Sequence, residues 1–130
     1  EVIDLSTEID LVIDPGYNQA EIVTNVIDKV SSFFNADNRE MGQDIFTGEM
    51  VKDITNQPGV INLVELRLYN KVGGEYSQNT VSQPYKDQAT KEIALIDGTV
   101  FAQPNQSFQV KFSSKDIVIR VKSMVQPTIS

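Results

Sequence analysis

The stretch from Met41 to Leu68 limits most strongly what this chain can fold into. It reads MGQDIFTGEMVKDITNQPGVINLVELRL: a glycine turn, a short amphipathic segment, a Pro-Gly break and an apolar run. Gly42 marks the turn, and Pro58 biases Gln57 away from helical backbone, so a helix must end before it. Apolar residues fall at helical spacing in between: Met50, Val51 and Ile54. The stretch therefore predicts a turn, a short helix and then a strand.

Polar residues predict where two helices begin. Asn18 is a favourable N-cap, and Glu21 three residues later can complete a capping box. Thr47 can cap the second helix, where Glu49 in the first turn favours the helix dipole. The first helix, which should end near Asn35, carries an apolar stripe: Ile22, Val23, Val26, Ile27, Val30, Phe33 and Phe34.

The first residues alternate with a period of two. Apolar side chains occupy odd positions and acidic ones even positions: Ile3, Leu5, Ile9, Leu11 and Ile13 against Asp4, Glu8, Asp10 and Asp14. This pattern predicts a half-buried strand with one wet, acidic face. A cation site is less favoured, since residues two apart on a strand lie ~7 Å from each other. A solvated face that blocks wrong edge pairing is the preferred interpretation.

The run from Val60 to Tyr69 predicts a strand whose apolar residues change parity. Leu66 and Leu68 share one face with Val64, whereas Ile61 and Leu63 lie on the opposite parity. Either both faces of the first half are covered, or a bulge shifts the register.

Residues 70–91 differ in character. They include Gly73 and Gly74, many amides and hydroxyls, and few large apolar groups. About twenty residues without a period is long for a connection within a domain, so we expect a polar arm that becomes ordered against a partner. Gly73-Gly74 is not followed by a helix start with Lys, which excludes a P-loop.

Residues 92–130 predict antiparallel strands. The pair Asp97-Gly98 lies between apolar runs, which is a strong hairpin signal. Two further alternating runs flank a turn at Ser113 to Asp116: Phe108, Val110 and Phe112 before it, and Ile117, Ile119 and Val121 after it. The whole chain, 1–130, is therefore expected to be a single α+β domain. It consists of a helix-and-strand half (1–69), an arm (70–91) and antiparallel strands (92–130).

The composition excludes several classes of function. The chain has no Cys or His and a net charge of −7, which argues against nucleic acid and anionic membranes as partners. No apolar run approaches the ~18 residues of a membrane span, and no signal peptide is visible. The charge is unevenly divided, with −10 in residues 1–65 and +3 in residues 66–130. This split could steer one copy onto another, or it could be chance.

Residues 2–70 resemble the carboxy-terminal part of the baseplate J-like proteins, the wedge subunits of contractile phage tails. The resemblance lies in the order and spacing of five elements: Glu8–Ile13, Ile22–Phe34, Arg39 to Gly42, Phe46–Ile54 and Gly59–Val60. Gln43 stands where an acidic residue is more usual. Because the chain begins at Glu1 and not at Met, we expect a fragment of a longer polypeptide.

The resemblance implies a structural subunit of a baseplate wedge, in a virion assembled in the host cytoplasm. Its partners would be itself, as a homodimer or ring, and other wedge proteins. The alternative is a carbohydrate- or receptor-binding β-rich module of a tail or surface protein.

No nucleophile–base constellation is visible, so we expect no enzyme activity, no catalytic residues, no metal and no cofactor. The interface candidates are aromatic and basic: Phe33, Phe34, Tyr76, Tyr85, Arg120 and Lys122. Tyr76 and Tyr85 are chosen because Tyr is enriched where loops dock. A wide core stripe would also explain Phe33 and Phe34, and Tyr76 and Tyr85 could equally be exposed loop residues.

Overall fold

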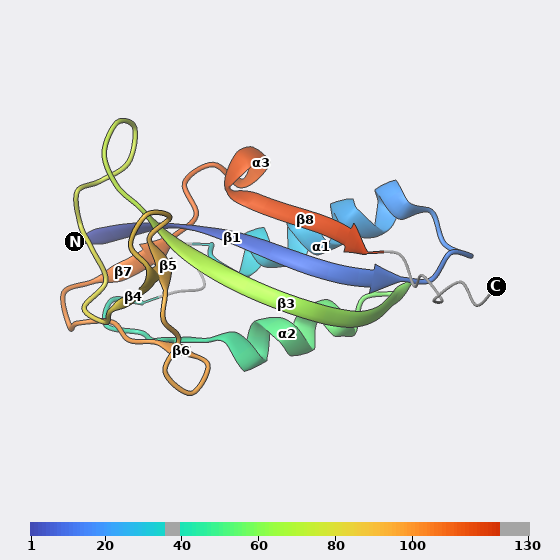
Figure 1. Cartoon of the computed structure of the whole chain (residues 1–130), viewed down its shortest axis with the longest axis horizontal. Helices are drawn as coiled ribbons and strands as arrows, with labels where there is room; N and C mark the ends of the chain where they lie inside the picture. Colours follow the sequence, from blue (N-terminus) through green and yellow to red (C-terminus); the bar gives the residue numbers. More distant parts are fainter. Residues whose placement is uncertain (36–39, 123–130) are drawn as a thin grey trace.

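The first strand of the chain lies inside the sheet and is paired along both edges. The computed structural model describes residues 1–35 and 40–122. Strand β1 (Val2–Ile13) pairs antiparallel with β3 (Val60–Lys71) on one edge (Figure 1). On its other edge it pairs in parallel with β7 (Ser107–Gln109) and β8 (Ile117–Lys122).

The expectation of antiparallel strands throughout residues 92–130 is therefore wrong for β7 and β8. Alternation reports which face of a strand is buried, whereas direction depends on the route of the connections. The expected turn at Ser113 to Asp116 is a short helix, α3 (Ser113–Asp116), which leads into β8.

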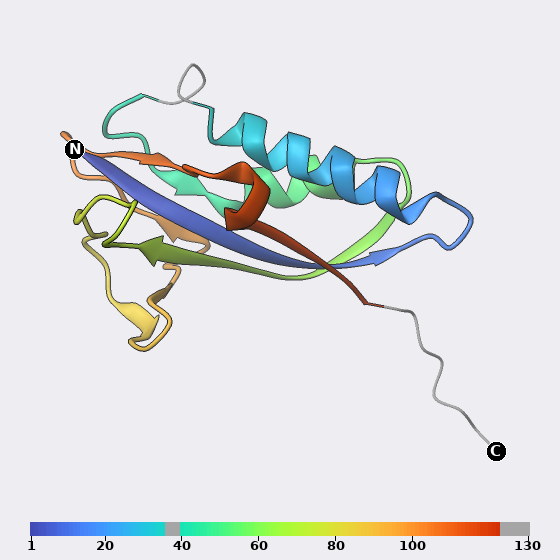
Figure 2. The ribbon, with the colours of Figure 1, turned by 90° about the horizontal axis from the view of Figure 1, so that it is seen from above.

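Two helices cover one face of this sheet. Helices α1 (Gln19–Phe33) and α2 (Thr47–Thr55) lie on the same side in Figure 2. The odd positions of β1 are buried beneath them, as the alternation predicts: Ile3, Leu5, Ile9 and Leu11. The Asn18 cap is confirmed, since its Oδ1 accepts the Glu21 N–H at 3.1 Å. No helix in the described ranges combines the length and apolarity needed to cross a membrane.

The opposite face of β1 is not the wet acidic face that the alternation predicts. Asp4 is only 2% exposed and Asp10 only 5%. Asp4 accepts the Ser77 N–H at 2.8 Å and Gln109 Nε2 at 2.6 Å, and Arg67 lies against Asp10. Long-range partners from other segments cover these carboxylates, which local alternation cannot show.

Of the two explanations for the parity change in β3, the bulge is the one that the structure shows. Its register against β1 skips Val64 and Ile61, so neither has a partner residue there. These two side chains are 54% and 50% exposed, while Leu63 and Leu66 both pack against the core. Each bulge thus restores the inward direction of the next apolar residue.

The predicted turn at Asp97-Gly98 is present, with φ of 51° and 71°. Ile96 and Thr99 exchange two backbone hydrogen bonds across it, as in a two-residue hairpin turn. The two segments that flank this turn then diverge, because β6 (Thr99–Val100) pairs with β2 (Ile45–Phe46). Thr47 is not the N-cap of α2, since Phe46 occupies that position. The Thr47 hydroxyl donates instead to the Gly98 carbonyl at 2.7 Å.

The predicted arm, 70–91, is folded onto the domain. Val81 and Gln83 are buried, and the segment contributes β4 (Tyr85–Asp87), which pairs with β5 (Glu92–Ile93). Asn70 holds the segment from inside: its Oδ1 accepts the Val81 N–H at 2.8 Å. The arm interpretation is therefore wrong, because polar side chains satisfy this backbone within the chain itself.

Strands from all three expected segments share the sheet, whose order is β4-β5-β3-β1 followed by β7 and β8. The α+β class is confirmed. Gly42 has a positive φ of 75°, as a turn there requires, whereas Arg39 lies outside the described residues.

Candidate interaction surface

A row of charged side chains crosses the sheet on the face away from α1 and α2. Arg67 Nη2 on β3 lies 2.6 Å from Glu65 Oε2 and 3.6 Å from Asp10 Oδ2 on β1. Burial alone would lower the pKa of Arg67, but the charges of Glu65 and Asp10 outweigh it and raise the pKa. Asp10 Oδ1 is buried with no hydrogen-bond partner in the part of the chain that the structure describes.

The row continues onto β8 through Arg120. Its Nη2 lies 2.7 Å from Glu8 Oε2, so this interface candidate is already paired within its own chain. On the other side of Glu8 lies Tyr69. Burial, followed by the hydrogen bond and the charge of Glu8, raises the pKa of Tyr69 to about 12. Tyr69 is therefore a neutral donor over the whole physiological pH range.

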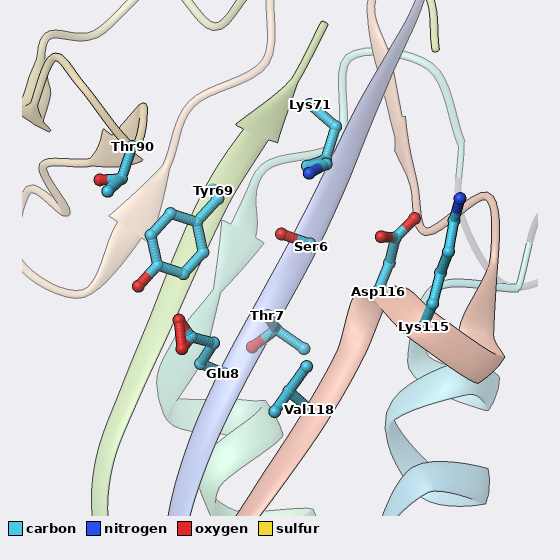
Figure 3. Close-up of a pocket in the computed structure, with 9 residues that line it drawn as sticks. All are labelled: Ser6, Thr7, Glu8, Tyr69, Lys71, Thr90, Lys115, Asp116 and Val118. Atoms are coloured by element: carbon cyan, nitrogen blue, oxygen red, sulfur yellow. The ribbon is translucent and has the colours of Figure 1, made fainter. Parts of the chain in front are cut away.

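A shallow cleft of about 260 Å³ opens beside this row (Figure 3). Tyr69 and Lys71 line it from β3, Thr90 from the segment before β5, and Lys115 and Asp116 from α3. The remaining lining residues are Ser6, Thr7, Glu8 and Val118. The cleft thus gathers two lysines, two carboxylates and several hydroxyl groups from segments that are far apart in the sequence.

Tyr76 lies outside the lining of this cleft and joins the 72–79 loop to α3. Its hydroxyl lies 3.0 Å from both carboxylate oxygens of Asp116, to which it donates. Burial and this hydrogen bond raise the pKa of Tyr76. The Tyr76 ring packs edge-on against Phe112, with ring centroids 5.7 Å apart. The hydroxyl of this interface candidate therefore already has a hydrogen-bond acceptor within the domain.

The other aromatic candidates also belong mainly to the domain itself. Phe34 is buried in the core and Phe33 packs against it, with ring centroids 5.3 Å apart. The wide core stripe thus explains both residues, and Phe34 is wrong as an interface candidate. The Tyr85 hydroxyl donates to Asn70 Oδ1 at 3.2 Å, and burial raises the pKa of Tyr85.

Lys122 is exposed at the end of β8, as expected, and so is Arg120. If the charge split steered one copy onto another, these cations would meet acidic residues of the first half, such as Asp10. Asp10, expected to face solvent, is instead buried against Arg67. A contact between Arg120 of one copy and Asp10 of another would require two existing ion pairs to break. Steering of one copy onto another by the uneven charge distribution would therefore have to involve residues other than this pair.

Sequence reasoning missed the residues that organise this surface. In its local sequence context, each of Lys71, Thr90 and Lys115 is an ordinary polar residue. Lys71 continues the β3 alternation on the same side as Arg67 and Tyr69, which was the available signal. No local sequence pattern indicates Thr90 or Lys115.

No group of three or more acidic side chains within the described ranges is arranged to hold a metal ion. Comparison with known protein families found no match for this chain, and neither did a search among curated proteins. The surface must therefore be interpreted from its own geometry.

Proposed function

We propose that this domain is a structural subunit of a phage tail baseplate wedge, which acts by self-association and by contact with other wedge proteins. The proposal draws on the resemblance of residues 2–70 to the baseplate J-like proteins. It also draws on the two outer edges of the sheet, which belong to β3 and β8.

The observation that carries the proposal is the outer edge of β3. Among the described residues this edge is paired only at its end, where Tyr69 faces Glu92 and the Asn70 N–H donates to the Lys91 carbonyl. The stretch from Val60 to Leu68 therefore has no second strand. The exposed Val64 and Ile61 lie along the same stretch. Open edges that carry apolar side chains favour association with another chain.

A second open edge supports the same function. Within the described residues β8 pairs only with β1, and its outward Val118 is exposed. A domain with free edges on both sides of one sheet can contact two neighbours at once, which closing a ring requires.

Sedimentation velocity over a concentration series tests the proposal. We expect a monomer–dimer or higher equilibrium, weakened at least tenfold by Val64→Lys or Ile61→Lys. Met41→Lys replaces an equally exposed apolar side chain away from the sheet edge and serves as the control. A strictly monomeric chain at high micromolar concentration would contradict the proposal, as would equal effects of all three substitutions.

A further inference from the structure

Two adjacent clefts on the outer face of the sheet together make up what we call the lysine groove. The first is the cleft beside Tyr69, and the second, also about 260 Å³, extends along Val72, Gly73 and Tyr76. Lys71 and Thr90 line both clefts, so the two lie side by side. Lys115 lines the first cleft and Lys91 lines the second.

The ammonium groups of Lys71 and Lys91 lie beside aromatic rings and not beside carboxylates. Lys71 Nζ lies 5.3 Å from the centre of the Tyr76 ring, and Lys91 Nζ lies 5.6 Å from that of Tyr85. In the described part of the chain neither lysine has a carboxylate within ion-pair distance, unlike Lys115, which lies 3.3 Å from Glu75. Rings fix the position of a cation while leaving its charge available to a ligand.

The acidic residues nearest to these lysines are engaged elsewhere. Asp4 is the cross-strand neighbour of Lys71, but its two oxygens accept the Ser77 N–H and Gln109 Nε2. Asp116 is buried and accepts from the Tyr76 hydroxyl. The groove therefore presents two unpaired cations and the hydroxyls of Thr90 and Ser6 in a chain whose net charge is −7.

We infer that the lysine groove binds the carboxylate side chains of an acidic, extended segment of a partner protein. Each cleft is shallow and has a volume of about 260 Å³, which suits single side chains and not a docked helix. Glu8 also lines the first cleft, where it is paired with Arg120. Two unpaired lysines can bind single carboxylates but do not form the row of cations that a phosphate polymer requires. This site goes beyond the proposed function, because it lies on the sheet face and not at the β3 edge.

The test is an NMR titration of the ¹⁵N-labelled chain with a capped hexaglutamate peptide. We expect saturable shifts at the amides of Lys71, Thr90 and Lys91, with a Kd of about 1 mM or tighter at low salt. Lys71→Gln and Lys91→Gln should each weaken binding at least threefold. Lys52→Gln is the matched control, because it removes one lysine charge from the exposed surface of α2; it should leave binding unchanged.

Three comparison ligands make the result decisive: inorganic phosphate, a hexathymidine oligonucleotide and maltohexaose. If any of these binds as tightly as the peptide at the same amides, the assignment to an acidic protein segment is overturned. Absence of localised shifts, or equal effects of all three lysine substitutions, overturns it too. The outcome is independent of sedimentation, since a chain without this site could still associate through β3.

Discussion

Asp10 Oδ2 lies 3.6 Å from Arg67 Nη2, across the pairing of β1 with β3. Because the aspartate is almost completely buried, this arginine is what makes its charge tolerable there. Arg67→Met should therefore destabilise the fold by about 2 kcal/mol. Chemical denaturation measures this free energy of unfolding.

The matching control is the double variant. Asp10→Asn removes the charge that Arg67 neutralises, so Arg67→Met should cost less in that background, by about 1 kcal/mol or more. Identical costs in both backgrounds would mean that Arg67 stabilises by packing alone.

Gly59 approaches α1 too closely for any side chain. Its φ is +87°, and an added Cβ would lie 2.6 Å from Ile22 Cδ1. Gly59→Ala should cost about 2–3 kcal/mol, since it combines backbone strain with overpacking. Gly48→Ala is the matched control: it lies in α2 with nothing within 4 Å of the new Cβ, and should be neutral or slightly stabilising in thermal unfolding.

Asn70 holds residues 72–91 against the sheet. Its side chain accepts from the Val81 N–H and the Tyr85 hydroxyl, and donates to the Asn79 carbonyl at 3.3 Å. Asn70→Ala should cost about 2 kcal/mol and speed the hydrogen exchange of the Val81 amide in the monomer. The exposed Asn62→Ala provides the comparison. Fast Val81 exchange already in the unmodified chain would restore the arm interpretation.

Tyr69 predicts an alkaline limit to stability. Its pKa is raised from 10 to about 12 in the fold, so between these values the folded state binds more protons than the unfolded one. The stabilisation is complete below pH ~10 and is lost as pH rises towards 12. The free energy of unfolding should therefore fall less steeply over this window in Tyr69→Phe. An unchanged slope in pH-dependent denaturation would show that Tyr69 titrates normally.

Local signals predicted the covered side of the sheet well. The odd positions of β1, the Asn18 cap and the Asp97-Gly98 turn each depend on neighbours within a few residues, and each is confirmed. The bulge in β3 was predicted as one of two alternatives, because a parity change permits only a few solutions.

What failed depended on distant partners. Asp4 reads as a surface residue until Ser77 and Gln109 reach it from more than seventy residues away. Residues 72–91 read as an arm because side chains such as Gln83, which donates to the Ala94 and Thr99 carbonyls, satisfy the backbone in place of a regular ladder. Apart from the alternation of β3 that includes Lys71, the lysine groove has no local pattern, since four separate segments assemble it.

The placement of β1 has a consequence for how the molecule forms. Thr7 on β1 pairs with Ile117 on β8. The second edge of β1 can therefore be covered only after a strand near the other end of the described chain has been synthesised. Such non-local pairing raises the contact order and slows folding, because loop closure must come before the contacts that reward it. During synthesis β1 and β3 can form an antiparallel pair while the other edge of β1 stays bare. A chaperone or a neighbouring subunit that shields this edge would therefore act on the nascent chain and not on the finished domain.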